Sequence, residues 1–113
     1  MLAEPKPDRK AHKKASQAEN LLNHIENVLA KYAGENEKTR LHVVKNYVEG
    51  DTKGYIEVRR SGRKMSLVTI AVNTEREYAY RYFDNFEAVN YFPLSEIDDQ
   101  LGDVHDFIKW WPN

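Results

Sequence analysis

The segment 54–83 constrains the fold of this chain most, because its pattern predicts three consecutive β-strands joined by two short polar turns. Strands connected by such short turns run antiparallel. In the first turn, a three-residue loop over 60–62 places Gly62 in the left-handed position that these loops require. The loop pairs Val58 with Lys64 and Arg59 with Arg63, and strand alternation then puts these apolar residues on one face: Ile56, Val58, Val68, Ile70 and Val72.

The second turn decides where three tyrosines lie. Extending the same alternation through 73–77 favours a loop with an odd number of residues, which puts Tyr78, Tyr80 and Tyr82 on the apolar face. We therefore expect these rings to pack in the core and not to form a platform for stacking nucleic-acid bases. A register slip of one residue reverses this expectation. The opposite face is then mostly polar and carries Glu57, Arg59, Thr69, Ala71, Glu77 and Arg81.

Two amphipathic helices flank the strands. Ser16 and Glu19 have the spacing of a capping box, which predicts that the first helix begins at Ser16, and Gly34 suits its end in a left-handed conformation. Ser95 opens the second helix. Each helix has an apolar stripe at three- and four-residue spacing. The stripes are Leu21, Leu22, Ile25, Val28, Leu29 and Tyr32 in the first helix, and Ile97, Leu101, Val104, Ile108 and Trp111 in the second.

Two further segments are interpreted from local pattern alone. Residues 41–49, rich in β-branched and aromatic side chains, predict a strand ahead of the hairpins. A turn over 50–54 follows it, with Gly54 at a positive φ. Residues 84–92 fit two alternatives, a short helix capped by Asp84 or a short fifth strand, and the pattern does not separate them.

These elements predict an α+β fold in the order α-β-β-β-β-α, with an extra short element at 84–92. We expect a four-stranded antiparallel β-meander with an N-terminal and a C-terminal helix packed on one face. Residues 1–15 are basic, contain two prolines and have few apolar side chains, so they predict a flexible basic arm. Residues 16–113 then form a single domain.

The composition excludes several classes of protein. The 113 residues include no cysteine, which rules out disulfides, thiolate metal sites and cysteine nucleophiles. The N-terminal segment lacks the apolar stretch of a secretory signal, and no segment has the ~18 apolar residues of a membrane span, so we expect a cytoplasmic protein without a membrane partner. Cofactor loops and zinc motifs are absent, and the one local His/carboxylate cluster, 103–106, spreads its side chains around a helix. A binding protein without cofactor or metal is thus favoured over an enzyme, and phosphodiester chemistry by Tyr, Arg and His is a third alternative.

Charge is strongly segregated along a chain whose net charge is only −1. Residues 38–74 contain eight Lys/Arg and three Asp/Glu, which gives +5. Four of these cations surround the first turn, where they repel one another and where a polyanion would turn repulsion into attraction. The leading hypothesis is a small non-enzymatic protein that binds DNA or RNA through this basic hairpin tip. The residues of the tip are Arg59, Arg60, Arg63 and Lys64.

The C-terminal part has the opposite charge. Residues 75–113 contain three Lys/Arg and nine Asp/Glu, which gives −6. The alternative hypothesis is a protein-interaction module, such as an inhibitor, immunity or adaptor protein, that presents an acidic helix and an exposed tryptophan to a basic protein partner. Two patches of opposite charge also permit head-to-tail self-association. The residues of the acidic surface are Asp98, Asp99, Asp103, Asp106 and Trp110.

Overall fold

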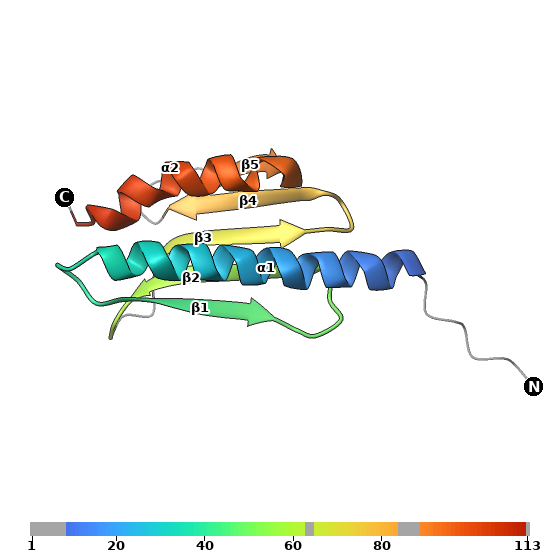
Figure 1. Cartoon of the computed structure of the whole chain (residues 1–113), viewed down its shortest axis with the longest axis horizontal. Coiled ribbons are helices and arrows are strands. Elements are labelled where there is room, and N and C mark those ends of the chain that lie inside the picture. The colour runs from blue at the N-terminus through green and yellow to red at the C-terminus, as the bar shows by residue number, and fades with distance from the viewer. Residues whose placement is uncertain (1–8, 63–64, 84–88, 113) are drawn as a thin grey trace, which may run out of the picture.

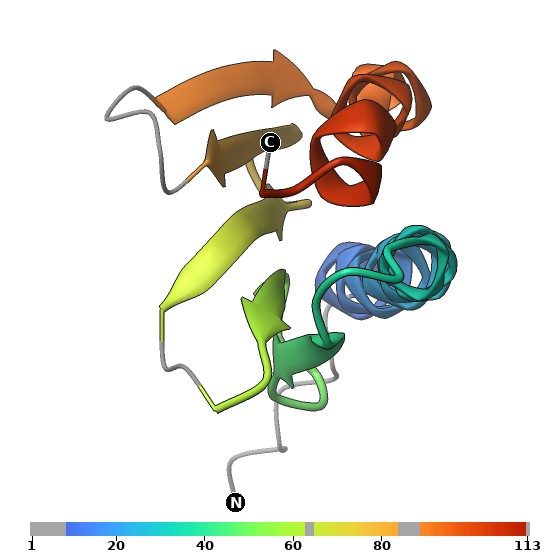
Figure 2. The ribbon, with the colours of Figure 1, turned by 90° about the vertical axis from the view of Figure 1, so that its left-hand side faces the viewer.

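A computed structural model describes residues 9–62, 65–83 and 89–112 of the chain. The five strands form one antiparallel sheet in chain order, and both long helices lie on the same side of it (Figure 1; Figure 2). The α+β class with two terminal helices is confirmed, but the sheet has five strands where four were predicted. The elements are α1 (Arg9–Glu35), β1 (Leu41–Tyr47), β2 (Lys53–Arg60), β3 (Ser66–Asn73), β4 (Tyr78–Phe83), β5 (Val89–Pro93), a 3₁₀ turn (Leu94–Glu96) and α2 (Ile97–Lys109).

The fifth strand, β5, begins in the segment whose structure the sequence pattern left open. It pairs antiparallel with β4. Phe92 is 4% exposed and belongs to the core, so one face of this short strand is anchored. From Val89 onward the segment 84–92 is therefore a strand and not a helix, while residues 84–88 lie outside the described part of the chain.

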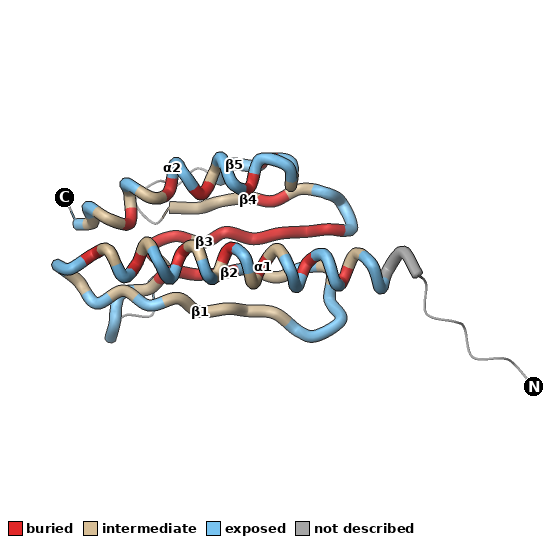
Figure 3. Tube along the Cα trace, viewed as in Figure 1, coloured by how far each residue is buried: buried red, intermediate tan, exposed pale blue. Residues whose placement is uncertain are grey.

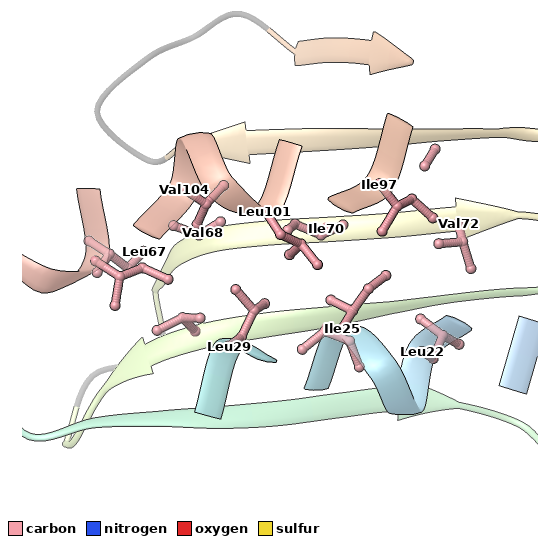
Figure 4. Close-up of a cluster of buried hydrophobic side chains, with 14 of the residues drawn as sticks. Leu22, Ile25, Leu29, Leu67, Val68, Ile70, Val72, Ile97, Leu101 and Val104 are labelled. Carbon is pink, nitrogen blue, oxygen red and sulfur yellow. The ribbon is translucent and has the colours of Figure 1, made fainter. Parts of the chain in front are cut away.

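The hydrophobic core lies between the two helices and one face of the sheet (Figure 4). Burying each Leu, Ile or Val contributes about 1.5–3 kcal/mol. Figure 3 shows that β3, the central strand, is buried along most of its length. The predicted apolar stripes of both helices and the shared face of five β2 and β3 residues are confirmed, except that Trp111 lies beyond the end of α2. The core contains Leu22, Ile25 and Leu29 from α1, Ile56, Val58, Val68, Ile70 and Val72 from the sheet, and Ile97, Leu101, Val104 and Ile108 from α2.

Helix α1 begins at Arg9, earlier than the predicted start at Ser16. Residues 9–15 of the predicted flexible basic arm are therefore helical, and residues 1–8 lie outside the described part of the chain. The reason is tertiary. Ala15 and Ala18 are buried and continue the apolar stripe toward the N-terminus with side chains small enough to let the helix approach the sheet. Lys14 Nζ also donates a hydrogen bond to Glu75 O, at 3.1 Å, in the β3–β4 turn. Ser16 is therefore an interior helical residue and not an N-cap.

Asn36, not Gly34, ends α1. Its Oδ1 accepts hydrogen bonds from Lys38 N (3.1 Å) and Thr39 N (3.0 Å), while its Nδ2 donates to Ile108 O (2.7 Å) and to Trp111 O (2.6 Å). One buried amide thus closes the end of α1 and joins it to the end of α2. Because the Asn36 side chain forms hydrogen bonds both to the following turn and to the end of α2, it ends α1 without a glycine in the left-handed conformation.

Two histidine–carboxylate pairs bind the helices to each other. His24 of α1 contacts Asp98 of α2 at 2.7 Å, and His105 of α2 contacts Glu35 of α1. The hydrogen bond from His105 lowers the pKa of Glu35 below its ordinary value of 4.5. Tyr32 stacks on His105 with ring centroids 4.2 Å apart. These contacts hold α2 beside α1, so that both cover the same face of the sheet.

The β2–β3 hairpin keeps the predicted parity but not the predicted pairs. Val58 lies opposite Val68, not opposite Lys64, and Arg59 lies opposite Ser66. From Lys53 to Val58 the shift is four residues, an even number that keeps these side chains on their predicted faces. Between Val58 and Arg59 the register changes by one residue, as in a β-bulge. Gly62 has a φ of 80°, which confirms its left-handed conformation. Arg63 and Lys64 lie outside the described residues.

The β1–β2 turn uses a different glycine from the one predicted. Gly50 has a φ of 89°, whereas Gly54 lies inside β2. Tyr47 pairs with Gly54 in the sheet register. The positive-φ position predicted for Gly54 is therefore wrong, and its lack of a side chain serves packing instead.

The β3–β4 turn overturns the prediction for the tyrosines. Asn73 pairs with Tyr78, so the turn over 74–77 has four residues, an even number that moves β4 by one position. Thr74 is fully buried and its Oγ1 donates a hydrogen bond to Lys14 O, at 2.7 Å, in α1. This anchor sets the turn length. The helix-covered face therefore receives Ala79, Arg81 and Phe83, and the opposite face receives Tyr78, Tyr80 and Tyr82.

Candidate ligand-binding face

Five tyrosines lie on the face of the sheet that carries no helix. One row of the register runs from Tyr55 through Ala71 and Tyr80 to Tyr91, across four strands. The side chains of Tyr91 and Tyr55 are 65% and 39% exposed. The Tyr91 ring lies 5.8 Å from that of Tyr78 and 5.7 Å from that of Tyr80, between centroids. We call this surface the tyrosine face, defined by Tyr55, Tyr78, Tyr80, Tyr82 and Tyr91.

The tyrosine face is hollowed at the end that meets β1 and the β1–β2 turn, whose Val48 and Asp51 are among the lining residues. This cavity of about 610 Å³ is also lined by Ala71 of β3, with Tyr55 on one flanking strand and Tyr80 on the other. Since the side chains of β3 on this face are small, the larger tyrosines of β2 and β4 stand above them. The cavity volume falls in the range of small-molecule sites, about 300–1,000 Å³.

Tyr80 lies half-buried in the middle of the tyrosine face. Burial raises its pKa above the ordinary value of 10.0, and the neighbouring Tyr91, Tyr78 and Tyr55 add to the increase. Tyr80 is therefore a neutral phenol at physiological pH. A neutral ring can stack and donate a hydrogen bond without repelling an anionic ligand.

A buried carboxylate, that of Glu57, binds several polar side chains elsewhere on this face. Glu57 is 6% exposed and accepts hydrogen bonds from Arg59 Nη2 (2.9 Å), Arg59 Nε (3.1 Å), Asn46 Nδ2 (2.9 Å) and Ser66 Oγ. Burial alone raises the pKa of Glu57, but the hydrogen bonds from Arg59, Ser66 and Asn46 outweigh burial, so the pKa is lowered below 4.5. The hydrogen bond to Glu57 raises the pKa of Arg59. The Arg59 guanidinium is thus held in one plane, with Nη1 not used by Glu57.

Arg59 and Arg60 of the predicted basic tip point to opposite faces of the sheet. Alternate residues of a strand point to opposite faces. Arg59 therefore lies on the tyrosine face, while Arg60 lies toward the helix side, where its guanidinium is 5.9 Å from the Trp111 ring. Arg60 is exposed, and Arg63 and Lys64 lie outside the described residues.

Strand β2 instead brings a different pair of cations to the tyrosine face. Lys53, Tyr55, Glu57 and Arg59 alternate on this face. Lys53 is exposed, and within the described part of the chain its ammonium group forms no ion pair. The two cations are six residues apart, which in an extended strand is about 20 Å. Sequence reasoning did not identify Lys53 as a partner of Arg59, although their even spacing on one strand was a usable signal.

Two carboxylates of the acidic surface of α2 contact side chains of the same chain. Asp98 is paired with His24, and Asp103 Oδ2 lies 3.5 Å from Arg81 Nη1. Arg81 was predicted on the polar face but lies beneath α2, where Nη1 is buried without a hydrogen bond. All five residues of the predicted acidic surface are nevertheless exposed. Trp110 is 54% exposed, as predicted, and Lys109 Nζ lies 5.2 Å from its ring centroid.

Comparison with known proteins adds no assignment, since neither a protein-family model, a curated protein nor a solved structure matches the chain. Within residues 9–62, 65–83 and 89–112, none of the helices combines the length and the apolarity needed to cross a bilayer. The same residues contain no group of three or more His, Cys, Asp or Glu arranged to hold a metal ion. The tyrosine face, with its cavity and its two cations, is therefore the candidate functional site.

Proposed function

We propose that this protein binds single-stranded nucleic acid on its tyrosine face, as a binding protein and not as an enzyme. The observation that carries the proposal is the set of five tyrosines on the helix-free side of the sheet, with Tyr91 and Tyr55 well exposed. Each base that stacks on an aromatic side chain gains about 1–3 kcal/mol. A contiguous aromatic surface of this kind on a small domain indicates a binding partner.

The charges on the same face support a polyanion as that partner. Lys53 and Arg59 stand at the two ends of β2 with Tyr55 between them. A single strand lying along β2 would stack bases on the rings and place phosphates near both cations. Arg59 is already oriented by Glu57, so it loses little side-chain entropy when it binds a phosphate.

The proposal favours single strands because stacking on a flat face requires bases with accessible rings. In a duplex, both faces of each base are covered by its neighbours. The proposal retains Arg59 from the predicted hairpin tip but moves the site from the tip to the sheet face. Asp98 and Asp103 already contact His24 and Arg81 of their own chain, so we base the proposal on the tyrosine face and not on the acidic helix.

The test is fluorescence anisotropy with labelled DNA and RNA single strands of about 12 nucleotides, alongside the duplex of the same sequence. Replacing Tyr55 or Tyr91 by Leu keeps apolar bulk and removes the ring. We expect each change to weaken binding about 5- to 150-fold, the equivalent of one lost stack. The matched control is Tyr32→Leu, which removes a tyrosine ring in the helical layer. Equal affinities for all three variants, or tighter binding to the duplex, would refute the proposal.

Salt dependence tests the phosphate contacts separately. Lys53→Ala should reduce the slope of log K against log salt by about 0.7, the value for one phosphate on a single strand. The control is Lys31→Ala, because Lys31 is exposed on α1, in the layer on the other side of the sheet. If both variants have the wild-type slope, Lys53 contacts no phosphate.

A further inference from the structure

One row of the sheet crosses the cavity on the tyrosine face. Tyr55 of β2, Ala71 of β3 and Tyr80 of β4 are consecutive neighbours in the register. Adjacent strands are about 4.8 Å apart, so the two tyrosine strands are separated by about 9.6 Å. Only the methyl group of Ala71 stands between the two tyrosine side chains in this row. The row thus forms a slot with an aromatic residue on each side and a small apolar floor.

Polar groups border this slot. Asn73 is 7% exposed, its Oδ1 accepts a hydrogen bond from Arg76 N at 3.0 Å, and its Nδ2 forms none with another described residue. Asn46 donates its Nδ2 to Glu57, so its Oδ1 is left as an acceptor. Both asparagines line the cavity, and so does Lys53. The slot therefore combines a donor, an acceptor and a cation around an apolar floor, and Asp51 adds a carboxylate to the lining of the cavity.

We infer that this cavity is a subsite for one nucleobase of the bound strand, inserted between Tyr55 and Tyr80 above Ala71; the inference rests on the proposed function. A planar ring fits between two aromatic side chains in stacking geometry. The edge of the base meets the Asn73 amide and the Asn46 carbonyl, groups that can pair with base edges. Lys53 at the rim receives the phosphate of the same nucleotide. The rest of the tyrosine face, including Tyr91, stacks other bases without enclosing them.

Filling the slot while keeping every tyrosine tests the inference. Ala71→Leu places a bulky aliphatic side chain on the floor, and Thr69→Leu is the matched control, because Thr69 shares the strand and the face but does not line the cavity. We expect Ala71→Leu to weaken binding of the single strand at least tenfold, and Thr69→Leu to change it less than twofold. If Ala71→Leu does not fold, Ala71→Val makes a smaller change of the same kind.

A second measurement uses the wild-type protein with adenosine monophosphate. In ¹H–¹⁵N correlation spectra, the amide signals of Gly54 and Ala71 should shift on titration, because both residues line the cavity, and the signal of Gly102 on α2 should not. In the Ala71→Leu variant, the Gly54 shift should be lost. Shifts spread evenly over the protein, or confined to other regions, would overturn the subsite.

The two measurements separate failure of the subsite from failure of the proposed function. If the wild type binds the single strand but Ala71→Leu binds it equally well and the nucleotide shifts neither Gly54 nor Ala71, the subsite is wrong and the proposed function stands. If the wild type binds no single strand, the proposed function is wrong. In that case nucleotide-induced shifts at Gly54 and Ala71 would still support a base-binding cavity, and their absence would refute it.

Discussion

Gly54 offers a sharp test of how α1 packs on the sheet. It lies within β2, where a Cβ atom would come within 2.5 Å of Leu22 Cδ1 and within 3.0 Å of both Asn46 O and Tyr47 Cδ1. Leu22 is fully buried, and Asn46 O belongs to the backbone of β1, so neither can move aside freely. We therefore predict that Gly54→Ala destabilises the fold.

The magnitude follows from two opposing terms. Forcing an extra methyl group into a close-packed site costs about 1–3 kcal/mol. Replacing Gly by Ala also restricts the unfolded chain, which stabilises the folded state by about 0.4–1 kcal/mol. The net loss for Gly54→Ala is about 1–2 kcal/mol. For a domain of about 100 residues this lowers Tm by roughly 4–16 °C.

The same substitution at Gly102 is the control, with the opposite expected sign. Gly102 lies inside α2, and a Cβ atom there would meet no atom within 4 Å. Ala is favoured over Gly in a helix interior by about 0.8–1 kcal/mol. Gly102→Ala should therefore raise Tm by about 3–8 °C. Urea denaturation of both variants, read by circular dichroism, gives the two free energies of unfolding.

A double mutant identifies the atom responsible. Leu22→Ala alone should cost about 2–5 kcal/mol, because it opens a cavity in the core. In that background the 2.5 Å contact with Leu22 Cδ1 is absent. Gly54→Ala should therefore lower the free energy of unfolding by at least about 0.5 kcal/mol less than it does in the wild type. Residues in contact are usually coupled by about 0.5–3 kcal/mol. Equal costs in both backgrounds, or a stable Gly54→Ala single variant, would refute the assigned packing of α1 against β2.

Two further predictions concern polar groups that are buried in this fold. Asn36→Ala should lower the free energy of unfolding by at least about 2 kcal/mol in urea melts, because it leaves the carbonyls of Ile108 and Trp111 without the donor that Asn36 provides. Asn36→Gln should recover little of this stability, since the added methylene displaces the amide. The pKa of Glu57 is lower in the folded than in the unfolded state, so its stabilising effect is present above pH 4.5 and is lost as the pH falls through the folded pKa. Glu57→Gln should therefore flatten the decline of stability in the acid range, and a variant with the wild-type acid profile would show that the interaction of Glu57 with Arg59 does not contribute to it.

The parts of this fold that local sequence predicts well are those with a single apolar periodicity. The stripe of α2 and the alternation of β2 and β3 repeat at one period, so burial can satisfy them in only one orientation. The terminal helices on one face and the exposure of Trp110 followed from such patterns, whereas the fifth strand did not. The start of α1 did not follow from them, because alanines such as Ala15 and Ala18 are not recognised as an apolar stripe in the sequence. Their burial depends on packing against a distant turn.

The chemistry of the candidate site depended on the tertiary structure. β4 has aromatic or apolar residues on both alternations, Tyr78, Tyr80 and Tyr82 on one and Ala79 and Phe83 on the other, so its own pattern does not choose a face. The choice is made by the even-numbered turn before it. That turn is held by Thr74, whose hydroxyl contacts Lys14 and Thr52, residues 60 and 22 positions away in the chain.

The sequence by itself thus determined the α+β class, the two amphipathic helices, the first four strands and the aliphatic residues of the core. Only the tertiary structure decided that the tyrosines lie on the helix-free face and that Arg59 is bound to a buried Glu57. The physical reason is the two-residue period of a β-strand, for which one residue more or less in a turn exchanges the two faces completely. Contacts between distant segments set that turn length, and no local pattern contains them.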